Sequence, residues 1–161
     1  MKSAILAGLT LGIAVLGLAA CDRGEEPVAE TSVQDTAPDA PDGIAVSNGR
    51  IMLPAVPGNP AAVYFDIANT GAADKAIEAA FVTGAESAMV HTMSDSGMGA
   101  VSEVAVRPNS TVRFEPGGLH VMAMNLDPAL APGSTAEVTL TFVGGDKVSF
   151  PAQVRAAGDE R

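Results

Sequence analysis

The sequence is poor in cysteine, in aromatic side chains and in positive charge. Its 161 residues contain one Cys, no Trp, one Tyr and five Phe. A single cysteine cannot form a disulfide within the chain. Nine Lys and Arg residues stand against 19 Asp and Glu residues, for a formal net charge of -10. Because phosphate backbones are bound mainly by clusters of Lys and Arg, we exclude nucleic acid as a partner.

The motifs of the common enzyme classes are also missing. The sequence has no Gly-x-Gly-x-x-Gly or Walker loop, no Gly-x-Ser-x-Gly elbow and no His-Glu-x-x-His pair. Its many acidic residues cannot be sorted into catalytic pairs without knowing which strands face one another. We therefore predict that the protein is not an enzyme.

The first 20 residues are typical of a secretory signal peptide. Lys2 is followed by an apolar run over residues 4–20 and then by Cys21, the only cysteine. This junction resembles the lipobox of bacterial lipoproteins, which implies that Cys21 is lipidated and that Asp22 favours retention at the inner membrane. The alternative is an uncleaved anchor, although the run is shorter than the roughly 20 residues of an ordinary membrane span.

The next stretch, residues 21–43, has the composition of an acidic flexible tether. It contains Pro27, Pro38 and Pro41, many acidic residues and a single base, Arg23, without any hydrophobic periodicity. Such a segment buries too little apolar surface to fold. The predicted domain organisation is a signal peptide (1–20), this tether, a folded domain (44–156) and a short tail (157–161).

The domain has the pattern of an all-β protein. Short apolar or alternating runs recur between turn signals such as Asn-Gly, Pro-Gly-Gly and Gly-Gly-Asp. Polar and apolar residues alternate most clearly over 137–142, as burial of one strand face requires. The predicted strands are 44–47, 62–69, 76–82, 88–93, 101–106, 111–114, 120–126, 136–143 and 148–154. Eight or nine strands at this spacing predict a sandwich or a small barrel.

Both histidines lie in one segment together with several methionines. The residues are His91, Met93, Met98, His120, Met122 and Met124. Alternation along each strand places the members of each group on a single face. Imidazole and thioether donors without carboxylate or thiolate favour Cu(I) over zinc, calcium or magnesium. The competing interpretation is structural, since methionine is a good core filler and a single histidine is usually a satisfied polar residue.

The segment 91–126 resembles the periplasmic copper chaperones called PCuAC, formerly a domain of unknown function. Met98 is followed by 21 residues and then by His120-Val121-Met122, as in the motif of that family, and Pro116-Gly117-Gly118-Leu119-His120 resembles its Pro-Gly-Gly-x-His turn. The segments 62–71 and 139–142 are similar to two further strands of the family. The resemblance covers about residues 44–155.

The resemblance implies a cupredoxin-like Greek-key β-sandwich that binds one Cu(I) near its surface. The implied ligands are His91, Met98, His120 and Met122. Six residues separate His91 from Met98 where the family usually has ten, so Met93 becomes a substitute ligand in this shorter loop. Met124 is expected to pack below the site. The cysteine, once lipidated, cannot supply the thiolate of a blue-copper centre.

The implied function is that of an extracytoplasmic Cu(I) metallochaperone, lipid-anchored on the periplasmic side of a membrane. Its copper recipient in the family is cytochrome c oxidase, often together with a thioredoxin-like copper protein. Two alternatives remain open. One is a copper-sequestering or resistance protein, which needs the same ligands. The other is a non-metal interaction module, which would be favoured if the strands carrying His91 and His120 lay on opposite edges.

Overall fold

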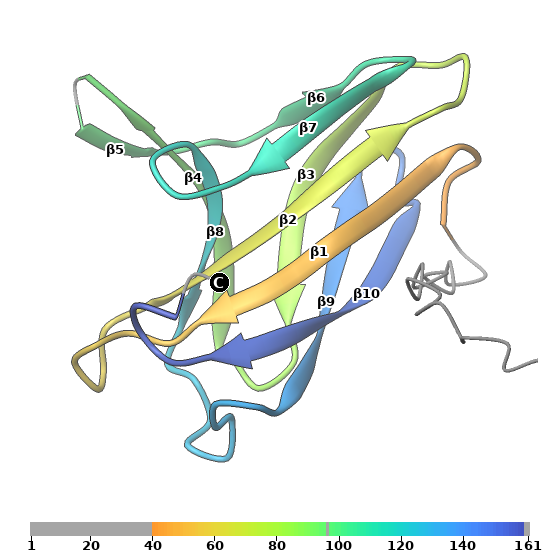
Figure 1. Cartoon of the computed structure of the whole chain (residues 1–161). Coiled ribbons are helices and arrows are strands. Elements are labelled where there is room, and N and C mark those ends of the chain that lie inside the picture. Colours follow the sequence, from red (N-terminus) through yellow and green to blue (C-terminus); the bar gives the residue numbers. More distant parts are fainter. Residues whose placement is uncertain (1–39, 96, 160–161) are drawn as a thin grey trace, which may run out of the picture. The chain divides into compact units, whose positions relative to one another are not determined.

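The computed structural model describes residues 40–95 and 97–159, and every regular element within those ranges is a β-strand (Figure 1). The strands are β1 (Ile44–Met52), β2 (Ala61–Asn69), β3 (Lys75–Val82), β4 (Ser87–Ser94), β5 (Gly97–Ala100), β6 (Val104–Val106), β7 (Ser110–Phe114), β8 (Leu119–Met124), β9 (Thr135–Phe142) and β10 (Lys147–Arg155). Within the described ranges, no helix has the length and apolar character needed to cross a bilayer. The predicted all-β class is confirmed.

The strands form one continuous sheet that curls into two layers. Their order is β5-β4-β8-β7-β2-β1-β10-β9-β3-β6, with β8 also pairing with β2. In Figure 1, β1 and β2 cross in front of β3 and β9. The parallel pairing of β1 with β10 joins the two layers, and both the β1–β2 and the β9–β10 pairings are antiparallel. Curling lets one sheet face enclose a core while the other stays accessible.

Alternation of side chains builds that core. Along β2 every second residue is buried, and β9 and β10 show the same period of two. Phe65 on β2 stacks on Phe114 of β7 with ring centroids 4.1 Å apart, and the ring of Phe150 on β10 lies 5.1 Å away. The first contact lies between paired neighbouring strands of one layer, and the second joins that layer to β10 across the core.

The structure has ten strands where the sequence predicts eight or nine. The added strand is β5, whose Gly-Met-Gly-Ala sequence has no apolar alternation and is exposed throughout. It forms because it pairs with β4 in a hairpin. The predicted strand 101–106 is correspondingly shorter, since only Val104–Val106 pair, with β3.

Only the end of the predicted tether lies within the described residues. There Pro41 is buried and Ala40 packs against the edge of the core. The proposed signal peptide, Cys21 and most of the tether lie outside the described residues.

A buried asparagine ties the end of β2 to β6. The Asn69 side chain is 1% exposed, and its amide nitrogen donates to the carbonyls of Ala73 at 2.8 Å and Val106 at 3.0 Å. Its oxygen accepts from the Gly71 backbone N–H at 2.9 Å. One side chain therefore closes the turn after β2 and satisfies a carbonyl on a strand 37 residues further along the chain.

We expect Asn69→Ala to lower the free energy of unfolding by about 2 to 3 kcal/mol, because buried polar groups lose their partner. Asn59→Ala, at an exposed turn position, should change it by less than about 0.5 kcal/mol. Urea unfolding of both variants checks this. Equal effects would show that the Asn69 hydrogen bonds contribute little to stability.

Candidate metal centre

The two histidines lie directly opposite each other on adjacent antiparallel strands. In the pairing of β4 with β8, His91 faces His120 and the preceding residue Val90 faces Val121. The two valines are buried in the core, so the alternation of each strand turns both imidazoles to the other face of the sheet. Their ring centroids are 6.1 Å apart with an interplanar angle of 44°. The strands are neighbours and not opposite edges.

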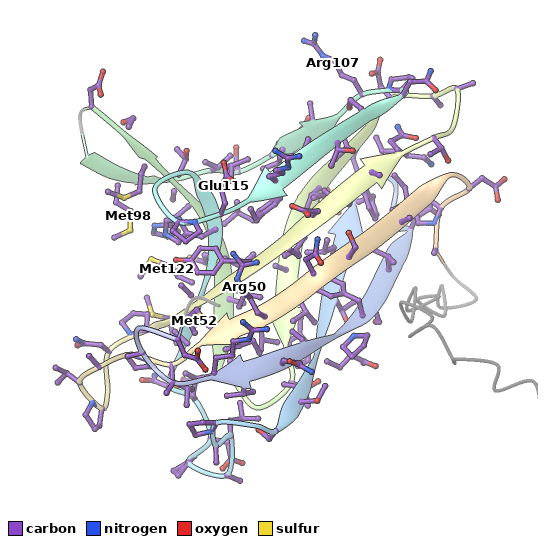
Figure 2. The ribbon with its side chains drawn as sticks, viewed as in Figure 1. Arg50, Met52, Met98, Arg107, Glu115 and Met122 are labelled. Atoms are coloured by element: carbon purple, nitrogen blue, oxygen red, sulfur yellow. The ribbon has the colours of Figure 1, made fainter. Side chains whose placement is uncertain are left out.

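Methionines stand on both sides of this pair along the same face. On one side Met93 of β4 is directly opposite Met98 of β5. On the other side Met89 of β4 is directly opposite Met122 of β8. Figure 2 shows Met98 and Met122 on the same side of the molecule, where yellow sulfur atoms gather. The face therefore presents a row of two imidazoles between two rows of two thioethers.

The turn before β8 orients one of the imidazoles. His120 is 8% exposed, and its Nδ1 lies 3.0 Å from the carbonyl oxygen of Gly118. That carbonyl also accepts the backbone N–H of Met93 at 3.2 Å, which fastens the turn to β4. Gly117 has a φ of 80°, a conformation that side-chain-bearing residues rarely adopt. With Nδ1–H donating to Gly118, Nε2 carries the lone pair that a metal could use.

The second imidazole has buried polar atoms without a hydrogen-bond partner. Both Nδ1 and Nε2 of His91 are buried from solvent and make no hydrogen bond. Leaving such a group unsatisfied costs roughly 1 to 3 kcal/mol, so an unpaired buried imidazole requires an explanation. A bound metal ion would satisfy one of these nitrogens.

Three of the methionines on this face are too exposed to be core filler. Met89, Met93 and Met98 are 47%, 44% and 53% exposed, whereas the core is built mainly from valine, isoleucine and phenylalanine. Met52 belongs to the same face, because it pairs with Ala62 on β2, which pairs with Met122. All six methionines of the described residues therefore lie on one face, as the line of Met98, Met122 and Met52 in Figure 2 illustrates. The structural interpretation of the exposed methionines does not account for this placement.

An aromatic ring and a cation lie beside the pair. The Tyr64 ring lies 6.5 Å from the His120 ring, and the Arg50 guanidinium lies over the Tyr64 ring at 5.0 Å. Within the part of the chain that the structure describes, no three His, Cys, Asp or Glu side chains gather as a metal-ligating group. The donors available at this face are therefore imidazoles and thioethers, which suit a soft monovalent ion.

The structure brings the four residues implied by the sequence motif onto one face. His91 and His120 form the central row, and Met98 and Met122 stand in the two flanking rows. Met93 lies opposite Met98. Either thioether can therefore approach the two histidines from that side. Met124 occupies the same face two residues beyond Met122, opposite Ser87.

Two residues of this face, Met89 and Met52, lie outside the sequence motif. Met89 precedes the motif by two residues, yet the alternation Met89-x-His91-x-Met93 already marks it as a member of the same strand face. Met52 carries no such signal, because its place depends on the order β8-β2-β1.

We expect His91→Leu to leave the stability of the metal-free protein unchanged or to raise it by about 1 kcal/mol, because it removes a buried unsatisfied group. His120→Leu should lower stability by about 1 kcal/mol, since it removes the hydrogen bond to Gly118. Urea unfolding in the presence of a chelator measures both. A larger loss in His91→Leu than in His120→Leu would mean that His91 is a structural residue.

Known proteins resemble this chain in sequence and in fold. A curated relative, "Putative lipoprotein Lxx21020" of Leifsonia xyli subsp. xyli (strain CTCB07), is 28% identical over 146 residues, which are 88% of this chain and 84% of the relative. The copper-bound PCuAC domain from PmoF2 is 22% identical with a TM-score of 0.61, over 71% of this chain and 93% of that domain. The solution structure of CuI-DR1885 from Deinococcus radiodurans is 24% identical with a TM-score of 0.56, over 84% and 90% of the two chains.

These solved structures show that the fold is that of PCuAC domains. The sequence model of one family, described as "Putative lipoprotein LpqE-like", matches residues 44–154, which span nearly all of the sheet. The chain belongs to this LpqE-like lipoprotein family.

Proposed function

We propose that the protein is an extracytoplasmic Cu(I) metallochaperone, held at a membrane by a lipid on Cys21. The observation that carries the proposal is the directly opposed pair His91 and His120, one of them unsatisfied, between exposed methionines. Copper is here the cargo of the protein. The proposed ligands are His91, His120, Met98 and Met122, with Met93 as the alternative to Met98.

The geometry suits one ion between the two rings. Metal–imidazole bonds are about 2 Å long, and a centroid separation of 6.1 Å is near the upper limit at which one ion contacts a nitrogen of each ring. This separation corresponds to a nearly linear N–Cu–N arrangement, so the rings would approach each other as a thioether from each flanking row completes a four-coordinate set. All four donors are neutral, and soft sulfur donors favour Cu(I) over harder divalent ions.

The choice between Met98 and Met93 depends on the hairpin. Met98 lies between Gly97, with a φ of 106°, and Gly99, and no atom comes within 4 Å of where a Cβ would be on either glycine. Met93 is held more firmly, because its backbone N–H bonds to the turn before β8. The open space around β5 favours Met98 as the ligand that can close on an ion and release it.

The exposure of Met93 and Met98 supports release of the copper ion to a partner protein. A ligand on an exposed hairpin can be exchanged one bond at a time with a recipient, without unfolding of the core. The names of two structural relatives refer to bound copper, and the family description refers to lipoproteins. A tether on a membrane anchor would raise the effective concentration of the domain near a membrane-bound recipient. Such a recipient could be cytochrome c oxidase or a thioredoxin-like copper protein. No catalytic step is required.

Anaerobic Cu(I) titration of residues 22–161 against a chromogenic chelator tests the site. We expect one tightly bound equivalent. His120→Ala/Met122→Ala should weaken binding by more than about 100-fold, because loss of even an outer-shell partner costs about 10- to 100-fold.

The matched control is Phe81→Ala/Thr139→Ala, another directly opposed pair, on β3 and β9. It should bind copper as the parent does. A parent that cannot compete with a weak chelator would refute the copper proposal and favour the non-metal interaction module.

Delivery is distinguished from sequestration by a transfer assay. The copper-loaded protein is mixed with the soluble copper-binding domain of a cytochrome c oxidase, and the spectrum of the recipient is followed. A chaperone should transfer copper faster on direct contact than across a dialysis membrane, because exchange runs through a complex. Retention of copper by the donor in both arrangements would favour the sequestering alternative.

A further inference from the structure

The methionines of this face outnumber the proposed ligands. The face consists of successive cross-strand rows, spaced about 7 Å apart along the strands because each row lies two residues further on. Met93 and Met98 form one row, the two histidines the next, and Met89 with Met122 the third. Once Met98 and Met122 are assigned to the first ion, only Met93 remains at the hairpin end, whereas Met89 and Met124 remain at the other end. Met52, on β1, is separated from Met122 by Ala62 of β2 and is only 9% exposed.

The thioethers of Met89 and Met124 are the neighbours of Met122 on this face. Met89 is its direct cross-strand partner, and such partners have Cβ atoms about 5 Å apart. Met124 follows Met122 by two residues on the same face and is diagonal to Met89, a separation of about 7 to 8 Å that long side chains bridge. Three flexible thioethers can therefore converge above the end of β8.

Burial and charge at this end also fit a soft ion. Met122 and Met124 are half-buried, while Met89 is 47% exposed and open to incoming ions. The nearby carboxylate of Glu86 already accepts a hydrogen bond of 2.6 Å from the side chain of Asn125. The donors left at this end are therefore the thioethers. An apolar filler would serve packing equally well at a half-exposed strand position, and a thioether adds only a soft donor.

We propose that Met89, Met122 and Met124 form a second, all-thioether binding site for Cu(I) or another soft monovalent cation. This inference rests on the proposed copper function of the adjacent site. Met122 belongs to both sites, so an ion held at the thioether site can pass to the imidazole pair by exchanging ligands around one shared sulfur. The thioether site binds more weakly than the imidazole site, as a landing position for entry or exit requires.

Titration with Ag(I), a stable soft monovalent probe, tests the second site in residues 22–161 carrying ¹³C-methyl methionine. The first equivalent should shift the methyl signals of Met98 and Met122. The second equivalent should shift those of Met89 and Met124 and move the Met122 signal further, because the Met122 sulfur then bridges the two ions. A second ion that shifts Met93 instead, or a protein that saturates at one ion, would overturn the second site and leave the copper chaperone proposal standing. Absence of any binding would refute both.

Volume-conserving variants provide the matched comparison. Met89→Leu/Met124→Leu should weaken the second ion by at least about tenfold and leave the affinity for the first within about twofold. Phe81→Leu changes a similarly exposed apolar side chain on β3 and should affect neither ion. The NMR spectrum of each ion-free variant verifies its fold. Loss of the first ion in the Leu double variant, with the fold intact, would contradict the separation into two sites.

Discussion

The register between β4 and β8 is the constraint on which the metal centre depends. Val90 and Val121 are opposed and buried, and this fixes His91 opposite His120 on the outer face. Because side chains alternate along a strand, a slip of one residue in either strand would turn its histidine toward the core. The pairing of Val121 with Val63 on β2 holds β8 from its other side. Packing of three buried valines therefore positions two imidazoles on the other face of the sheet.

Within this frame the two histidines differ in how they are held. His120 is oriented by the Gly118 carbonyl, which is also bonded to β4, whereas both nitrogens of His91 are buried without a partner. One proposed ligand is thus preorganised, and the other keeps a polar group that folding alone does not satisfy. A site of this kind sacrifices some stability of the ion-free state, as functional sites commonly do. The neighbouring thioethers carry no such cost, because a methionine sulfur requires no hydrogen bond.

The local sequence pattern predicted most of the strands and the strand faces of the site residues. It did not predict which strands pair with each other. Period-two alternation identified most strands and placed His91 with Met93, and His120 with Met122, on single strand faces. It could not show that these strands are neighbours, because pairing joins segments about 30 residues apart. β5 was missed because its glycines carry no strand signal. Met52 joins the face only through the order β8-β2-β1, which no local pattern records.

The central claim is that imidazole and thioether side chains from three strands coordinate one Cu(I) together. X-ray absorption of the protein loaded with one equivalent of Cu(I) examines this directly. We predict a mixed first shell of nitrogen at about 2.0 Å and sulfur at about 2.3 Å, values typical of such donors. A first shell of nitrogen and oxygen alone, with no sulfur, would contradict the account.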